Sequence, residues 1–165
     1  IKNIFTKVLK GHIGVATYNL NKNTTGKHLD IIARADLVIS QAVFEYIDNI
    51  EELYKMVSNM LSAGGIMSAT IDYSAHHLSK TAWNDHLKYS SFIWWLLKGN
   101  QPYFLNRKVH SDHINEINNN PLDIVLSERT RKPSSVNRIE LAKEFKDIDD
   151  EDLHTSGGYI IAKAP

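Results

Sequence analysis

Several side chains that can accept or donate protons lie close together in the middle of the sequence. Asp72, His76 and His77 fall within the stretch "IDYSAHH". Histidine titrates near neutral pH and a carboxylate can accept a proton, so both residue types serve as general acids or bases in enzymes. We therefore predict that Asp72, His76 and His77 are catalytic. A surface or packing role for any one of them is the alternative interpretation.

A second group of residues is suited to holding a polar substrate. In the stretch "NQPYFLNRKVH", amide, guanidinium and imidazole groups can bind substrate oxygens. Aromatic side chains nearby can stack on a sugar or ring, although such rings also serve simply to pack a lid. The predicted substrate-binding residues are Trp83, His86, Tyr103, Asn106, Arg107 and His110.

The eight histidines also permit a metal-binding interpretation. The two candidate ligand sets are His76, His77 and His86 beside Asp72, or the pair His110 and His113. Zinc and iron sites use such ligands. The spacings match none of the familiar metal-binding signatures, so we predict no metal site and keep a histidine-rich metal-binding protein as an alternative function.

The residues that precede these groups predict a strand, a helix and a second strand. The apolar run in "ADLVISQAVFEYID" is typical of a strand covered on both faces, at residues 36–40. Apolar residues at helical spacing follow over 50–61, and "IMSATIDY" alternates as a strand over 66–71. A helical connection of this length makes the two strands parallel, with a right-handed crossover.

Local signals mark both ends of the predicted helix. Asp48, with Glu51 three residues later, resembles a capping box at its start. Gly64 and Gly65 supply a residue that can adopt the left-handed conformation at its end.

Polar residues follow both predicted strands at their carboxyl ends. Ser40 and Gln41 follow the first strand, and Asp72 and Tyr73 follow the second. Ligands of open α/β sheets bind outside the carboxyl ends of the strands, so these four residues should lie near one binding site. The alternative is that the polar residues only begin loops.

The rest of the chain predicts a lid and a closing part of the sheet. Residues 74–110 are rich in histidine and aromatic residues, which suggests helices over the strand ends within an insertion at about 74–120. A short helix at 111–118 capped by Ser111, and a strand in "PLDIVLSERT", come next. A short helix in "RIELAKEF", an acidic loop in "KDIDDEDL" and a last strand in "GGYIIAKA" complete the chain.

Composition limits the class of protein. The 165 residues suit one domain, and the 19 basic residues equal the 19 acidic ones, so no net field attracts nucleic acid. The longest apolar run, at 92–97, is too short to span a membrane, and cysteine is absent, as is common in reducing compartments. We expect a cytoplasmic protein that binds neither nucleic acid nor membrane.

The segment "ADLVISQAVFEYIDNIEELYKMVSNMLSAGGIMSATIDY" resembles the C-terminal half of S-adenosylmethionine-dependent methyltransferases of the Rossmann-like class. In that family, a D-L-V-x-S strand precedes a V-L-E-H-I-like segment, a helix, a P-G-G-like turn and another strand. Here "VFEYI" and "SAGG" take those places, with Tyr46 for the common His and Ala63 for the common Pro. The stretches "NRKVHSDHINEI", "LDIVLSERT" and "EDLHTSGGYIIAKAP" also resemble the tails of bacterial methyltransferases of glycan pathways.

The resemblance implies a fold, a cofactor and a substrate class. The fold is a Rossmann-like α/β sheet of three layers, with an antiparallel last strand and a helical lid insertion. The cofactor is S-adenosyl-L-methionine, contacted by Ser40, Gln41, Ala42 and Val43. The acceptor is a small molecule or a glycan.

The family binds its cofactor with a glycine-rich loop, and no G-x-G occurs in this sequence. By resemblance, "HIGVATY" corresponds to a strand that comes after that loop. We therefore expect residues 1–165 to form one N-terminally incomplete methyltransferase domain, with 12–18 poorly anchored to the sheet and with little activity by itself. The alternative is a noncatalytic, degenerate α/β interaction module.

Overall fold

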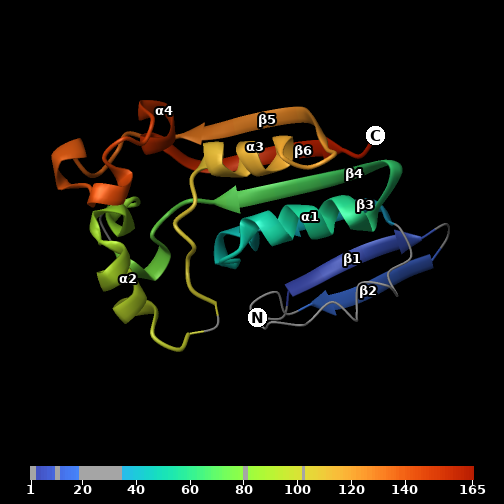
Figure 1. Ribbon diagram of the computed structural model, residues 1–165, viewed down its shortest axis with the longest axis horizontal. Coiled ribbons are helices and arrows are strands. Elements are labelled where there is room, and N and C mark those ends of the chain that lie inside the picture. The colour runs from blue at the N-terminus through green and yellow to red at the C-terminus, as the bar shows by residue number, and fades with distance from the viewer. Residues whose placement is uncertain (1–2, 10–11, 19–34, 80–81, 102) are drawn as a thin grey trace.

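A computed structural model describes residues 3–9, 12–18, 35–79, 82–101 and 103–165 (Figure 1). The main sheet has four strands in the order β3-β4-β6-β5, and a separate two-stranded sheet pairs β1 with β2. The strands are β1 (Asn3–Leu9), β2 (His12–Tyr18), β3 (Ala35–Gln41), β4 (Leu61–Asp72), β5 (Asp123–Arg131) and β6 (Thr155–Lys163). The helices are α1 (Ile50–Met60), α2 (Ser91–Lys98), α3 (His110–Asn118) and α4 (Asp150–Leu153). Short 3-10 turns are η2 (Phe44–Tyr46), η3 (His76–Leu78), η4 (Asp85–Lys88), η5 (Arg138–Glu140) and η6 (Lys143–Phe145).

The strand pairing confirms the predicted sheet. β3 runs parallel to β4, from Leu37 opposite Ile66 to Gln41 opposite Thr70. β6 runs antiparallel to β4, and β5 antiparallel to β6. The α/β class, the parallel pair and the antiparallel last strand are therefore as predicted. β2 has the predicted bounds, and β1 is the strand with which it pairs; this pair lies outside the main sheet.

The main core lies between the sheet and two helices. α1 and α3 cover the same face of the sheet (Figure 1). The apolar stripe of α1 is buried against sheet residues such as Met67, Ile71 and Ile160. Each such side chain contributes about 1.5–3 kcal/mol by leaving water. On the opposite face, Ile39 and Ile66 are exposed among the residues that the structure describes.

The ends of α1 differ from the prediction. Asn49 caps the helix by accepting the N–H of Glu52 at 3.1 Å, whereas the Asp48 carboxylate accepts from Lys98 of α2. The helix ends at Met60, before the two glycines. Gly64 has a φ of +75° within the irregular start of β4, and a Cβ on Gly65 would lie 2.9 Å from the carbonyl oxygen of Ala35. The glycines therefore shape the entry into β4 rather than the end of the helix.

Three other predicted elements also need correction. Ser111 does not cap a helix: α3 begins at His110, and the Asp112 carboxylate accepts the N–H of Val109 at 3.0 Å. The predicted helix in "RIELAKEF" is two 3-10 turns, η5 and η6, and the predicted acidic loop contains α4. Between η5 and η6, the N–H of Ala142 donates to the carbonyl of Leu87 at 3.0 Å, a tertiary contact in place of a helical hydrogen bond.

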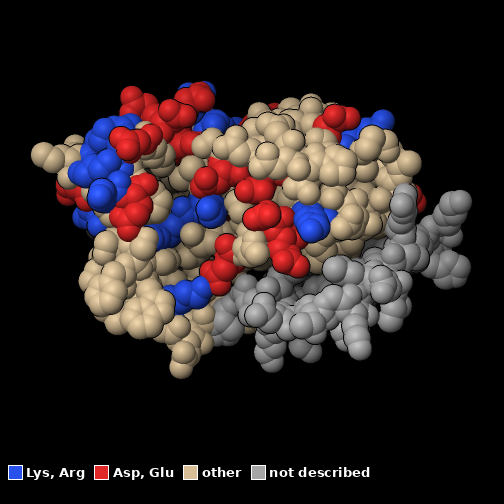
Figure 2. Space-filling model, viewed as in Figure 1, with Lys and Arg blue, Asp and Glu red and all other residues tan. Residues whose placement is uncertain are grey.

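The predicted lid region contains η3, η4, α2 and α3. Of these, α3 packs on the sheet beside α1, whereas η3, η4 and α2 lie beyond the carboxyl end of β4 (Figure 1). The lid has its own small core of Trp94, Phe104 and Leu105. Phe92 and Trp95 of α2 are both 65% exposed. Figure 2 shows an uncharged area at its lower left, where Figure 1 places α2. Within the described parts of the chain, no helix is both long and apolar enough to cross a membrane.

Candidate functional site

The carboxyl end of β3 presents the residues predicted to contact the cofactor. Ser40 is buried, and its hydroxyl has no partner among the described residues. Gln41 is exposed, and Ala42 adopts a φ of +49°, with its N–H donating to the carbonyl of Thr70 at 2.9 Å. Val43 is half-buried against the core. The backbone therefore turns sharply at the strand end and leaves one polar side chain exposed and one buried hydroxyl unpaired.

Glu45 is the residue at this end of the sheet that sequence reasoning missed. It lies in η2, is only 3% exposed, and neither carboxylate oxygen has a hydrogen-bond partner within the described parts of the chain. Burial raises the pKa of Glu45 to about 7, and the nearby charge of Asp72 adds to the increase, while the amides of Glu45 and Asp72 lower it in part. The available signal was a lone acid within the apolar stretch "AVFEYI".

The predicted acid and base are neighbours at the end of β4. The Asp72 carboxylate accepts the N–H of Ser74 at 2.8 Å, and its other oxygen lies 3.5 Å from Nε2 of His76. Nδ1 of His76 lies 3.0 Å from the hydroxyl of Tyr46, the residue at the position of the common His. His76 is thus held between Asp72 and Tyr46. The side chain of His77 lies outside what the structure describes.

His86 is a buried residue of this site. It is 4% exposed in η4, and its Nδ1 has no partner among the groups that the structure describes. Burial lowers the pKa of His86 to about 3, and the cation of Arg107 lowers it further, so the ring is neutral at pH 7. Glu45, Asp72, Tyr73, Ser74, His86 and residues 105–108 enclose a small cavity, which we call the strand-end crevice.

Asn106 fixes η2 against the lid. Its side-chain amide donates to the carbonyls of Phe44 and Ile47, both at 2.8 Å, and its backbone N–H donates to the carbonyl of Glu45 at 2.8 Å. The predicted substrate-binding amide is therefore occupied by the backbone, and this contact positions Glu45.

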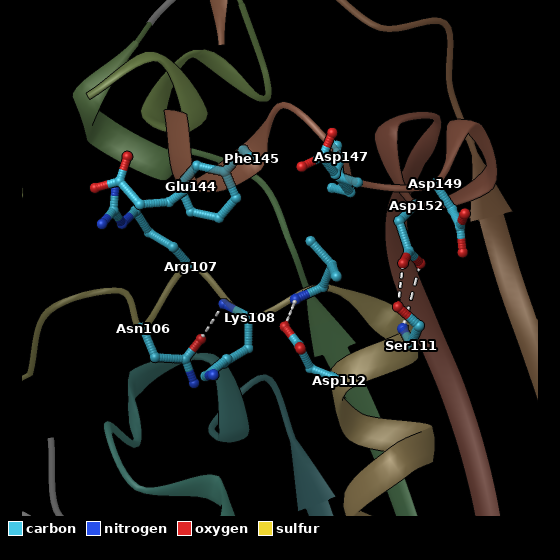
Figure 3. Close-up of a pocket in the computed structure, with 12 residues that line it drawn as sticks. Asn106, Arg107, Lys108, Ser111, Asp112, Glu144, Phe145, Asp147, Asp149 and Asp152 are labelled. Atoms are coloured by element: carbon cyan, nitrogen blue, oxygen red, sulfur yellow. Dashed lines mark hydrogen bonds between the residues drawn. The ribbon is translucent and has the colours of Figure 1, made fainter. Parts of the chain in front are cut away.

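Arg107 has a φ of +62° and extends into the lid (Figure 3). Its guanidinium lies 4.8 Å from the ring of Trp94 and 4.9 Å from the ring of Phe145, and donates to the carbonyl of Tyr89 at 2.5 Å. Burial lowers the pKa of Arg107, which nevertheless stays charged at pH 7. Arg107 thus joins α2 to η6 through cation–π and hydrogen-bond contacts.

Residues 106–108 also line a larger cavity of about 510 Å³ (Figure 3). We call it the acidic cavity because acidic residues outnumber basic ones on its wall. The acidic residues are Asp112, Glu144, Asp147, Asp149 and Asp152, and the basic ones are Arg107 and Lys108. Residues 106–108 border both the acidic cavity and the strand-end crevice.

The other predicted substrate residues lie apart from the crevice or in packing contacts. Trp83 donates its indole N–H to the carbonyl of Pro133 at 2.8 Å, and Tyr103 is half-buried in the segment that connects α2 to α3 along the chain. His110 is buried, with Nδ1 3.1 Å from the hydroxyl of Tyr73 and Nε2 2.8 Å from the hydroxyl of Ser127. The substrate-binding roles of Trp83, Tyr103 and His110 stay predictions, which none of these contacts among the described residues supports.

The histidines are not gathered as metal ligands in the part of the chain that the structure describes, where no group of three or more His, Asp or Glu side chains could hold an ion. His110 and His113 lie near one another, but Nδ1 of each faces a tyrosine hydroxyl. Burial lowers the pKa of His110 to about 4 and that of His113 to about 3. These two neutral rings are buried side chains of α3.

Comparison with known proteins identifies the fold. A search against protein-family models and a search of curated proteins found no match. Among solved structures, the chain is similar to an S-adenosylmethionine-dependent methyltransferase from Mesorhizobium loti, with 16% identity, a TM-score of 0.50, and coverage of 88% of this chain and 67% of that chain. It is also similar to a methyltransferase of this type from Methanosarcina mazei, with 10% identity, a TM-score of 0.49, and coverage of 89% and 65%. The chain thus spans about two thirds of the length of these two proteins, and it has the α/β fold of S-adenosylmethionine-dependent methyltransferases.

Proposed function

We propose that the protein containing this chain transfers a methyl group from S-adenosylmethionine to a small-molecule or glycan acceptor. The observation that carries this proposal is the meeting of polar groups at the carboxyl ends of two parallel strands within a methyltransferase fold. Ser40 to Val43 would contact the cofactor, since a buried unpaired hydroxyl and a sharply turned backbone fit one edge of a polar ligand. When bound, the cofactor supplies an electrophilic methyl group.

Positioning of the acceptor carries most of the catalysis in such a transfer, together with at most one base. The lid would hold the acceptor over the strand ends, with Arg107 joining its parts. Asp72 and Tyr46 orient the ring of His76, which makes His76 a candidate proton acceptor at the end of β4.

Calorimetry on the full gene product that contains this chain tests the cofactor assignment. We expect binding of S-adenosylmethionine and of its demethylated product, and about tenfold weaker binding in Gln41→Ala if its side chain makes a hydrogen bond to the cofactor. Gln101→Ala, another exposed glutamine at the far end of the lid, is the matched control and should bind normally. If neither S-adenosylmethionine nor its demethylated product gives a heat of binding, the noncatalytic module is favoured instead.

Arg107→Ala tests the separate role of the lid. It should lower transfer from a radiolabelled donor and leave cofactor affinity near that of the original protein, because Arg107 contacts Trp94 and Phe145 rather than the end of β3. Loss of cofactor binding in this variant would contradict the proposed division between strand ends and lid.

A further inference from the structure

The carboxyl group of Glu45 is buried without a partner in a place where a ligand can reach it. A buried carboxylate normally accepts several hydrogen bonds, and leaving it without them is costly. Both oxygens of Glu45 lack a partner among the described residues, yet the side chain lines the strand-end crevice. Asn106 holds the backbone of Glu45 in place through the hydrogen bond to its carbonyl oxygen.

The crevice has room for one small group. Its volume of about 10 Å³ matches the space that one water molecule or one nitrogen atom occupies. A whole acceptor molecule cannot enter it, but the tip of a longer molecule can. The acidic cavity, which shares the lining residues Asn106, Arg107 and Lys108 with the crevice, is large enough, at about 510 Å³, for the rest of such a molecule.

The wall of the crevice is rich in hydrogen-bond acceptors. Glu45 and Asp72 contribute carboxyl oxygens, and the neutral ring of His86 has an unpaired Nδ1 within the described structure, which is an acceptor in the tautomer that carries its proton on Nε2. Two cations, Arg107 and Lys108, also line it, but neither forms an ion pair with Glu45 among the described side chains. Arg107 already donates to Tyr89 and Ser91. The missing group is therefore a donor of two or three hydrogen bonds that tolerates acidic neighbours, which describes an amine.

We propose that the strand-end crevice binds the terminal amine nitrogen of the methyl acceptor, with Glu45 as its hydrogen-bond acceptor and base. This inference rests on the proposed methyl transfer and narrows its acceptor to an amine. The acidic cavity supplies a site of matching charge for the remainder of a cationic molecule.

The step balances without another reactant. An ammonium group gives one proton to the Glu45 carboxylate, which leaves a neutral amine and a carboxylic acid. The nitrogen lone pair then forms a bond to the methyl carbon as the carbon–sulfur bond breaks and its electron pair stays on sulfur as a thioether. The sulfonium charge passes to the methylated ammonium product, and Glu45 later releases its proton to solvent.

A matched set of probes tests the chemistry of the crevice. Butylamine, butanol and butyrate differ only at the tip, and their binding to the full gene product can be followed by the NMR amide signals of Ser74 and Asn106. We expect saturable shifts with butylamine near pH 7 and none with butanol or butyrate. Glu45→Gln keeps the shape of the side chain and removes its charge. This variant should bind butylamine at least about tenfold more weakly than the original protein. Glu51→Gln, an exposed glutamate on α1, should bind like the original protein.

Each outcome separates this inference from the proposed function. Equal shifts with butanol, or unchanged butylamine binding in Glu45→Gln, would overturn the amine site even if S-adenosylmethionine binds. Binding of butylamine that depends on Glu45 in a protein that does not bind S-adenosylmethionine would support the amine site and overturn the methyl transfer. Circular dichroism and thermal unfolding of Glu45→Gln verify that the variant is folded.

Discussion

Two carboxylates of this protein are almost equally buried but have opposite surroundings. Asp152, 4% exposed in α4, accepts from Arg129 at 2.6 Å and from the N–H and hydroxyl of Ser111. Glu45, 3% exposed in η2, forms no side-chain hydrogen bond in the described structure, and the nearby amides of Glu45 and Asp72 offset the effect of burial on its pKa only in part. Asp152 joins β5 to α3 and α4, whereas Glu45 faces a crevice. A buried acid with complete hydrogen bonding serves the fold, whereas one without it is a candidate for contact with a ligand, the role that we propose for Glu45.

The largest expected effect concerns the partner of Asp152. Arg129→Met should lower the free energy of unfolding by about 3–5 kcal/mol, because it leaves Asp152 charged and buried without a cation. Arg131→Met is the matched control in the same strand: Arg131 is 67% exposed, so loss of its pair with Glu151 should change the free energy by at most about 1 kcal/mol. Urea denaturation near pH 7 measures both. Equal losses would remove the distinction between the two pairs.

Glu45→Gln should raise the free energy of unfolding near and above pH 7, in contrast to Arg129→Met. The pKa of Glu45 rises on folding from its ordinary value of 4.5 to about 7, so the folded state keeps a proton that the unfolded state releases. The free energy of unfolding of the original protein therefore falls as pH rises from about 4.5 through 7. Above pH 7, the variant should be more stable by at most about 3 kcal/mol, and this gain should vanish near pH 4. Denaturation of both proteins across this pH range measures the gain.

Glu51→Gln provides the control for that pH dependence, since Glu51 is an exposed glutamate of α1. Its stability curve should follow that of the original protein. A Glu45→Gln curve that also follows it would mean that Glu45 is paired in solution.

A smaller loss is expected when Asp152 keeps its cation but loses one neutral donor. Ser111→Ala removes the hydroxyl that donates to Asp152, and the backbone N–H of residue 111 and Arg129 remain. The free energy of unfolding should fall by about 1–2 kcal/mol. Ser135→Ala, at an exposed serine, should stay within about 0.5 kcal/mol of the original protein. A loss as large as that of Arg129→Met would mean that the hydroxyl, and not the cation, supports Asp152.

The smallest expected change tests the surroundings of Glu45. Asp72→Asn removes a negative charge near Glu45, so the pKa of Glu45 should fall toward its ordinary value, but burial should keep it raised. Asparagine can still accept the N–H of Ser74, so stability should change by less than about 0.5 kcal/mol. Carbon-13 NMR titration of the Glu45 carboxyl measures the shift. A complete return to the ordinary pKa would assign the perturbation to Asp72 instead of burial.

The sequence alone predicted the elements whose signals are local. Apolar runs and alternation gave the parallel strands β3 and β4 and the last strand β6, and helical spacing gave α1. It also placed His76 near Asp72, because the stretch that contains His76 leaves the end of β4 directly. The N-cap of α1 could not be assigned from the sequence, because Asp48 and Asn49 are both residue types that cap helices. In the structure Asn49 is the cap, and Asp48 accepts from Lys98 instead.

Only the tertiary structure decided which polar residues are already paired. Ser111 and Asp152 lie 41 residues apart, and no local pattern indicates that one completes the other. Arg107 was predicted to hold substrate, and its place between Trp94 and Phe145 depends on two segments that meet only in the folded chain. Glu45 went unnoticed for the same reason. The sequence determines which groups can donate or accept a hydrogen bond, but packing of distant segments decides which of them lose water and which then find a partner.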